Sequence, residues 1–249
     1  MNEHIFEKFD AELDKLRSRL IKMGTLLQQQ IDYTLKSLTT NDVSLADIVI
    51  QNDDKIDKID IKIDKQCMKI FAQLQPVASD LRVTMAAISI NDNMELIGDI
   101  LVDIAKTFKK TPELPPLVKN ELVIDFGKTV EKIIVTSLDS FIYANSNLAK
   151  DVVTLSRQSK EQFYSAFEYH IEAIKANPEN TEYCMYMNDI NRNLKFIADL
   201  SVNIAHEIIF IIDAKIVKHG YQLNKKEIYE VDETSDDKDM GLEEEESQE

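Results

Sequence analysis

The sequence predicts an all-α protein: two tandem antiparallel three-helix bundles followed by a disordered acidic C-terminal tail. Three observations lead to this prediction, namely the scarcity of glycine and proline, apolar residues at helical spacing, and a stretch that recurs one hundred residues later. The 249 residues include only five Gly and five Pro, whereas an all-β chain with many tight turns needs more of both. Apolar residues make up 44% of the chain and charged residues 30%, a balance typical of a folded globular protein.

Three helices are expected in the first half of the chain. The first carries an apolar stripe with steps of three and four residues, at Phe9, Leu13, Leu16, Leu20, Met23, Leu27, Ile31, Leu35 and Leu38. Gly24, beside this stripe, lets another helix approach closely. Residues 39–42 end this helix and cap the second, which stops at Pro76. The third helix starts near Asp80 and runs to about Lys109.

The second half repeats this order after a proline-rich joint. Three prolines between residues 112 and 116 form the only plausible linker, because a helix cannot continue through them. A fourth helix is expected over about residues 117–143, and a fifth helix ends at about Ala176. The sixth runs from about residue 179 to residue 218, with Gly220 where a C-terminal cap is expected.

An internal repeat supports two similar domains. Residues 97–105 and 197–205 share Ile, Asp, Val, Ile and Ala, which is five of nine positions. Shared helical packing explains apolar identities, but the aligned aspartate favours duplication. We therefore expect a first bundle over residues 1–111, a second over residues 112–222, and a tail over residues 223–249.

Acidic residues concentrate at the C-terminal end. Residues 227–249 hold twelve acids and one lysine, a net charge of -11, so the rest of the chain carries only -5 of the total of -16. Because that body has no basic stripe to neutralise phosphates, nucleic-acid binding is not expected. The tail has too few large apolar residues to order itself and is predicted to be disordered, either as a solubilising segment or as a docking segment.

The sequence also predicts a cytoplasmic protein that is not an enzyme. Its apolar runs fall short of the roughly 20 residues that a membrane span needs, and the N-terminus lacks a signal-peptide pattern. Cys67 and Cys184 lie in apolar helical patterns, as small core residues do. None of the four histidines follows a glutamate by three residues, and glycine-rich phosphate loops and nucleophile elbows are missing. No organic cofactor is expected.

One stretch resembles a known family. Residues 75–82 read Gln-Pro-Val-Ala-Ser-Asp-Leu-Arg, and residues 95–99 read Glu-Leu-Ile-Gly-Asp. Together they resemble the signature of the PhoU family of bacterial phosphate-uptake regulators. The residues that carry the likeness are Gln75, Pro76, Asp80, Arg82 and Gly98.

The resemblance implies a fold and a role. It implies two similar three-helix bundles in a cytoplasmic homodimer that reaches the inner membrane only through its partners. Those partners would be the ATPase subunit of the ATP-driven phosphate importer and the phosphate sensor histidine kinase. The protein would restrain uptake and starvation signalling when phosphate is plentiful. The alternative is a metal-binding helical scaffold of a different phosphate carrier, sodium-coupled or of low affinity.

A candidate metal site lies on the third helix. Glu95, Asp99 and Asp103 are four residues apart, so their carboxylates share one helical face and can converge on a hard cation such as Mg²⁺, Mn²⁺, Ca²⁺ or iron. Acids at this spacing more commonly form a solvated helix face. The resemblance to PhoU proteins implies a metal, because relatives carry such an acidic motif on the third helix of each bundle.

The corresponding motif in the second half departs from this pattern. Asp199, Asn203 and Glu207 keep the register, but Lys195 stands where the first carboxylate belongs. A lysine there disfavours a cation by Coulomb repulsion and can pair with Asp199 instead. We therefore expect metal, if any is bound, at the first repeat.

Overall fold

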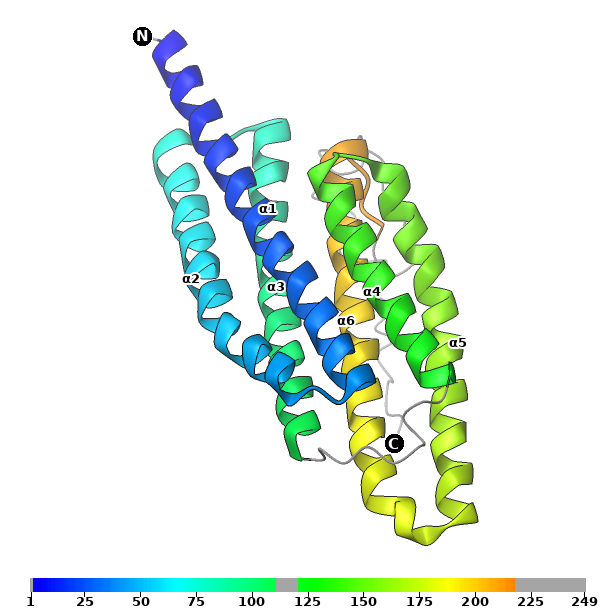
Figure 1. Ribbon diagram of the computed structural model, residues 1–249. Coiled ribbons are helices and arrows are strands. Elements are labelled where there is room, and N and C mark those ends of the chain that lie inside the picture. The colour runs from blue at the N-terminus through cyan, green and yellow to red at the C-terminus, as the bar shows by residue number, and fades with distance from the viewer. Residues whose placement is uncertain (1, 111–120, 218–249) are drawn as a thin grey trace, which may run out of the picture.

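The computed structural model describes residues 2–110 and 121–217, which fold into six long helices and a short 3₁₀ helix, η2 (Figure 1). The helices are α1 (Asn2–Thr40), α2 (Val43–Leu74), α3 (Ala78–Lys110), α4 (Glu121–Ile142), α5 (Ser146–Ala176), η2 (Pro178–Asn180) and α6 (Thr181–Asp213). The predicted all-α class of two tandem three-helix bundles is confirmed. The predicted proline linker and acidic tail lie outside the described residues.

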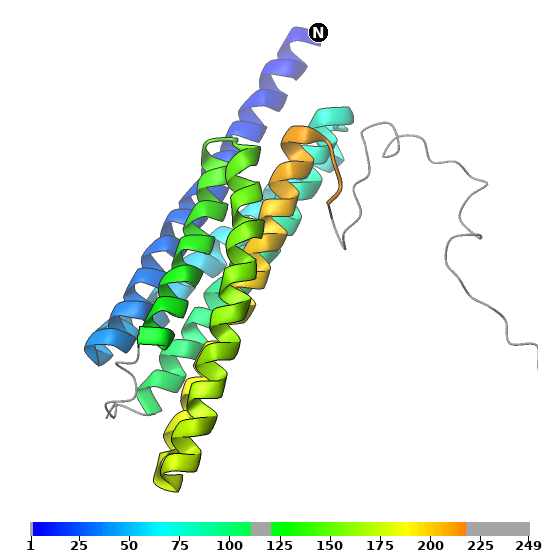
Figure 2. The same ribbon diagram turned by 90° about the vertical axis from the view of Figure 1, so that its right-hand side faces the viewer.

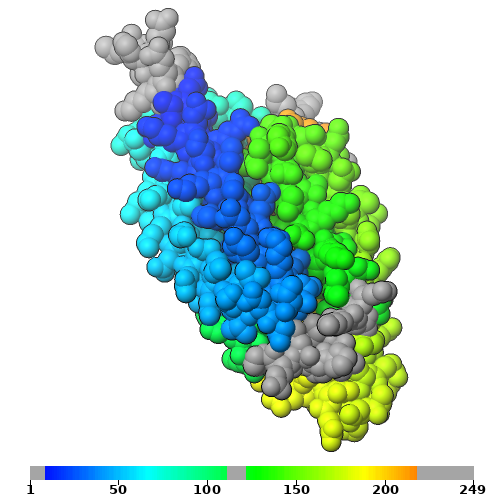
Figure 3. Space-filling view, viewed as in Figure 1, coloured from blue at the N-terminus to red at the C-terminus, as the bar shows by residue number. Residues whose placement is uncertain are grey.

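The two bundles lie side by side along their length. Helices α1, α2 and α3 pack on one another, as do α4, α5 and α6, while α1 contacts α4 and α3 contacts α6 across the boundary. Helices α2 and α5 therefore lie on opposite outer sides (Figures 1 and 2). The space-filling view shows the two halves in close contact along a long seam (Figure 3). Buried apolar side chains from both halves form one continuous core, a merger that the sequence did not predict.

The helix boundaries follow local capping chemistry. Asp42 caps α2 by accepting a hydrogen bond from the backbone N–H of Ser44 at 2.9 Å. Asn145 caps α5 in the same way, accepting from the N–H of Asn147 at 3.0 Å. These two caps stand 103 residues apart, at equivalent points of the two bundles.

The last helix is shorter than expected. It begins at Thr181, after η2, and ends at Asp213 instead of about Lys218. Ala214 adopts a left-handed conformation with φ 51°, which turns the chain out of the helix. Val217 then packs against the core, and this burial favours the reversal over further helix. The expected cap, Gly220, lies outside the described residues.

The internal repeat is visible in the burial pattern. Each buried residue of α5 stands 103 residues after a buried residue of α2, in the pairs Ala46/Ala149, Val49/Val152, Ile56/Ser159, Ile63/Ala166 and Cys67/His170. Helix α6 repeats α3 with an offset of 100, as in the pairs Ile90/Ile190, Asn91/Asn191 and Ile97/Ile197. The two bundles thus share one packing scheme.

Two glycines lie in the seam between the bundles, where α1 packs against α4. A Cβ on Gly24 would lie 3.2 Å from a methyl carbon of Leu138, and a Cβ on Gly127 would lie 3.0 Å from a methyl carbon of Leu35. Both distances are tighter than ordinary packing allows, so each glycine lets the opposite leucine approach. Because 24/127 and 35/138 both differ by 103, the same contact is made twice in opposite directions. The bundles are therefore related by an approximate two-fold axis.

Candidate functional site

Carboxylates from two neighbouring helices face one another on the first bundle. We call this the acidic face and define it by Asp53, Asp57, Asp60 and Asp64 of α2 and Asp92, Glu95 and Asp99 of α3. Asn91, which is fully buried on α3, holds the two helices in register. Its side-chain amide donates to Asp60 Oδ1 at 2.6 Å and to Asp64 Oδ1 at 3.1 Å. The seven acids thus line one face of the α2–α3 pair.

Burial, and after it the charge of neighbouring acids, raises the pKa of four of these seven carboxylates. Burial raises the pKa of Asp53 to about 6, with further contributions from the neighbouring charges of Asp57 and Asp99. The pKa of Glu95 is also raised, first by burial and then by Asp99 and Asp60. Asp53 Oδ1 is buried without a hydrogen-bond partner among the described residues. A cation on this face would relieve both the repulsion and the unsatisfied oxygen.

The donor set suits a hard metal ion. All seven side chains offer carboxylate oxygen, the ligand that Mg²⁺, Ca²⁺ and Mn²⁺ prefer. In the part of the chain that the structure describes, no three histidine, cysteine, aspartate or glutamate side chains stand close enough to hold a metal ion as they are placed. The acidic face is therefore a group of candidate ligands on two helices whose side chains have not converged.

The sequence-predicted residues of the first repeat fall partly on this face. Glu95 and Asp99 belong to it, whereas Asp103 is exposed one turn further along α3 and is not among the principal acids that raise the pKa of Asp53 or Glu95. Sequence reasoning missed the aspartates of α2. Their spacing of four, three and four residues, at positions 53, 57, 60 and 64, was the available signal.

The acidic face is not repeated in the second bundle. At the positions equivalent to those of α2, α5 carries Ser156, Lys160, Phe163 and Phe167. Helix α6 carries Arg192 and Lys195 where α3 has Asp92 and Glu95. The residue equivalent to Asn91 is the buried Asn191, whose two side-chain amide atoms have no hydrogen-bond partner among the described residues.

The structure separates the three residues of the second repeat. Lys195 Nζ lies 2.6 Å from Asp199 Oδ2, which confirms the expected ion pair. Asn203 instead donates to Asn93 Oδ1 of α3 at 3.3 Å. Glu207 is buried and accepts a hydrogen bond from Ser89 Oγ of α3 at 3.1 Å. Two of the three therefore join the bundles to each other and do not face α5.

The signature residues build the junction between α2 and α3. Gln75 ends α2 in a left-handed conformation with φ 46°, immediately before Pro76. Asp80 lies in the first turn of α3, where a carboxylate favours the free N–H groups, and Arg82 is half-buried in the next turn. A Cβ on Gly98 would lie 3.3 Å from Ile56 Cδ1, so this glycine lets α2 approach α3.

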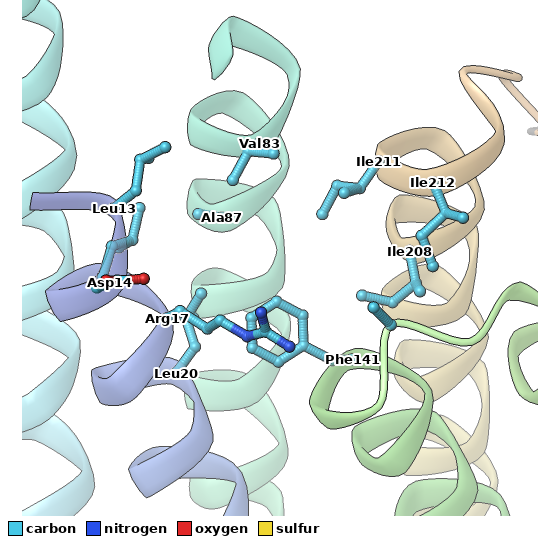
Figure 4. Close-up of a pocket in the computed structure, with 12 residues that line it drawn as sticks. Leu13, Asp14, Arg17, Leu20, Val83, Ala87, Phe141, Ile208, Ile211 and Ile212 are labelled. Carbon is cyan, nitrogen blue, oxygen red and sulfur yellow. The ribbon is translucent and has the colours of Figure 1, made fainter. Parts of the chain in front are cut away.

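Two cavities lie at opposite ends of the seam between the bundles. The Phe141 cavity has a volume of about 260 Å³, and Figure 4 shows side chains from α1, α3, α4 and α6 that line it. The Asn191 cavity, of about 220 Å³, is lined by residues of α1, α4 and α6. Leu20 and Ala87 line the first cavity, and their counterparts in the repeat, Val123 and Met187, line the second. The two cavities are therefore related by the repeat.

The remaining reactive side chains belong to the core. Cys67 and Cys184 are both buried, which confirms their expected place. Burial raises the pKa of Cys67 to about 12, so its nucleophilic thiolate is scarce at neutral pH. Burial lowers the pKa of His170, whose Nδ1 lies 2.8 Å from Asn188 Oδ1. None of the helices in the described ranges combines the length and apolar character that crossing a bilayer requires.

The chain matches one protein family in both halves. The PhoU domain matches residues 20–108 and 123–208. The phosphate-specific transport system accessory protein PhoU homolog of Aquifex aeolicus is 30% identical over 221 residues, which are 88% of this chain and 100% of the relative. The protein of the same name from Pseudomonas aeruginosa is 27% identical over 230 residues, 92% of this chain and 95% of that one.

Solved structures agree with the fold. The crystal structure of PhoU from Pseudomonas aeruginosa has a TM-score of 0.79 and 27% identity, covering 83% of this chain and 99% of its own. The phosphate transport system regulatory protein PhoU from Streptococcus pneumoniae has a TM-score of 0.73 and 23% identity, covering 84% and 99%. The second likeness is one of fold.

Proposed function

Because this chain belongs to the PhoU family, we propose that it acts as a non-enzymatic regulator of phosphate homeostasis. Its relatives are named as accessory proteins of phosphate-specific transport, and the match to them spans both bundles and nearly the full length of the relatives. That match is the observation that carries the proposal. In this role the protein is cytoplasmic and holds back phosphate uptake and starvation signalling when phosphate is abundant.

The proposed partners are the ATPase subunit of the importer and the sensor histidine kinase. The protein would act by binding them, as a homodimer, and not by chemistry of its own. The burial of both cysteines and of His170 supports a role without catalysis, because these three side chains are enclosed in the core and cannot reach a substrate.

We also propose that the acidic face binds a divalent metal ion or iron. Asp53, Asp57 and Asp60 from α2 and Glu95 and Asp99 from α3 would hold it, with oxygen ligands only. The unpartnered oxygen of Asp53 supports this assignment. The bound charge would neutralise facing carboxylates and so fix α2 against α3.

A clean deletion strain tests the regulatory role. Without the protein, phosphate-starvation genes are expected to remain expressed in phosphate-rich medium, and reintroduction of the chain is expected to restore repression. Normal repression in the deletion strain would contradict the proposal. A pull-down from native membranes in high phosphate then identifies the partner. Recovery of a carrier permease without the importer ATPase would favour the alternative, a scaffold of a different phosphate carrier.

A further inference from the structure

The chain turns back on itself after the last helix. Ala214 adopts a left-handed conformation, and the residues that follow run back along α6 (Figures 1 and 2). Ile216 and Val217 then line a cavity of about 310 Å³ together with Met85 of α3 and Phe210 of α6. The described part of the chain therefore ends on the surface where α3 and α6 meet, with residues 218–249 still to follow.

An exposed apolar strip continues from this cavity along the two helices. We call it the α3–α6 face and define it by six residues: Met85, Asn93 and Leu96 of α3 and Phe196, Asn203 and Phe210 of α6. The side chains of Met85, Leu96 and Phe196 are 53%, 42% and 48% exposed. Large apolar side chains exposed along one strip indicate a surface that another segment or molecule covers.

The neighbours of Val217 show where it lies on this face. It shares its cavity with Ser89 of α3 and Glu207 of α6, which are joined by a hydrogen bond of 3.1 Å. From that level, Leu96 lies seven residues along α3 and Phe196 eleven residues back along α6, toward the same end of these antiparallel helices. At 1.5 Å per residue, they lie about 10 and 16 Å from Val217 along the face.

The next nine residues match this surface in length and pattern. We call residues 218–226 the strap. In an extended segment alternate side chains point to the same side, so Tyr221 and Leu223 share the side of Val217. At about 3.3 Å per residue they come about 13 and 20 Å after Val217, which brings them to Leu96 and Phe196.

The charges of the strap and the face are complementary. The strap carries three lysines and no acid, with Lys218 at its start and Lys225 near its end. The α3 edge of the face carries the exposed Asp92 and Asp103, one turn before and two turns after Leu96, and neither is among the proposed metal ligands. The two bases on the α6 edge do not offset this attraction, because each is paired with an aspartate of its own helix, as in Arg192–Asp189 and Lys195–Asp199.

We propose that the strap lies along the α3–α6 face and covers it, with Tyr221 and Leu223 packed on Leu96 and Phe196. Because both belong to one chain, the strap is held near the face at a high effective concentration. A partner that binds this face must first displace the strap. This contact does not depend on the proposed regulatory function.

Cysteine cross-linking in the full chain tests where the strap lies. Leu223→Cys is combined with Phe196→Cys, or with Phe167→Cys as the matched control, because Phe167 is a similarly exposed aromatic residue (41%) on α5, outside the face. The native Cys67 and Cys184 are 0% exposed and do not compete. Under mild oxidation, a disulfide within one chain is expected to form about tenfold more in the Phe196→Cys pair than in the control pair.

Trypsin digestion tests whether the strap is held in place. Cleavage after Lys218 and Lys225, followed by mass spectrometry, is expected to be about tenfold faster in Leu223→Asp than in the wild-type chain, because the charge releases the strap. Leu242→Asp is the matched control, since it changes a leucine beyond the strap and is expected to leave the rate unchanged.

Each outcome decides for or against the contact. Preferential disulfide formation with Phe196→Cys and faster cleavage only in Leu223→Asp would support it. Equal cross-linking of the two pairs, or equal cleavage of the wild-type chain and Leu223→Asp, would overturn it. A disulfide between two chains would also overturn it, because a second copy would then cover the face. If Phe196→Cys fails to fold, the digestion still decides, since it needs no change in the bundles.

Discussion

At positions 53, 57, 60 and 64 the first bundle has four aspartates, whereas the equivalent positions of the second bundle hold Ser156, Lys160, Phe163 and Phe167. Every buried position of α5 nevertheless matches a buried position of α2. This difference teaches that packing and surface chemistry diverged separately after the duplication. Substitution in the core leaves a cavity or a clash, while substitution on the exposed face changes only what that face can bind.

The asparagine pair is an exception, because here a buried residue depends on the surface acids. The amide nitrogen of Asn91 donates to two aspartates of α2, whereas Asn191 is equally buried without such partners. Where the acidic face is absent, the buried amide therefore has no partner among the described residues. The following predictions test this contrast between the bundles, from the largest expected effect to the smallest.

The largest effect is expected for metal binding. Asp99→Ala removes a carboxylate of the acidic face and is expected to abolish bound metal, measured by elemental analysis of the purified protein. Asp199→Ala is the matched control at the equivalent position, and it should keep the metal because Lys195 already occupies that carboxylate. Metal retained in Asp99→Ala would disprove the assignment, and a wild-type chain that takes up no metal would return the face to a solvated helix surface.

The contact between α1 and α4 is expected to be symmetric, although the outer surfaces of the two bundles differ. Gly127→Leu forces a side chain against Leu35, and Gly24→Leu forces one against Leu138. Each change is expected to lower the free energy of unfolding by about 1–3 kcal/mol through overpacking, as measured by urea denaturation. Pairing each with the matching leucine-to-alanine change should recover part of the loss. A large effect at one glycine and none at the other would argue against the two-fold arrangement.

The contacts of Glu12 in the first bundle are expected to make the free energy of unfolding depend on pH. Hydrogen bonds from Lys15, Lys69 and Gln66 lower the pKa of Glu12 from 4.5 to about 2. The ionised form therefore stabilises the fold fully above about pH 4.5, and this contribution is lost as the pH falls through about 2. Glu12→Gln is expected to cost about 1–2 kcal/mol at neutral pH and to flatten the stability curve between those values. An unchanged curve would contradict this role.

The smallest expected effect is an increase in stability. Gln30 is 1% exposed with both amide atoms unpartnered among the described residues, and the equivalent position of the second bundle is Ile133. Gln30→Ile copies the apolar choice of the other repeat and is expected to raise the free energy of unfolding by about 1 kcal/mol. Thermal melting measures the change, and a lower melting temperature would show that Gln30 has a partner such as an ordered water.

Periodicity and proline positions predicted the six helices because both act locally. The apolar stripe of α1 and the stop at Pro76 depend on neighbours in sequence, and the structure has both. The end of α6 could not be read in this way, because the left-handed turn at Ala214 is favoured by the packing of Val217 against distant residues. Local signals gave no sign that burial would end the helix there.

The sequence predicted only the α3 residues of the candidate site. The spacing of Glu95 and Asp99 places them on one face of α3, but the facing aspartates of α2 depend on how the two helices pack. Sequence spacing also grouped Asn203 and Glu207 with Asp199 in one candidate site. In the structure both side chains instead contact α3 of the other bundle. Contacts between bundles require the tertiary arrangement.

The reciprocal glycine contacts have a consequence for how the halves can evolve. Two separate copies joined by such a seam would come apart on dilution, and every substitution would strike both sides at once. Within one chain the second half is held at a high effective concentration that does not change with the amount of protein in the cell. Each half can then be altered alone, so one can lose its acids while the other keeps them, and the pair still assembles.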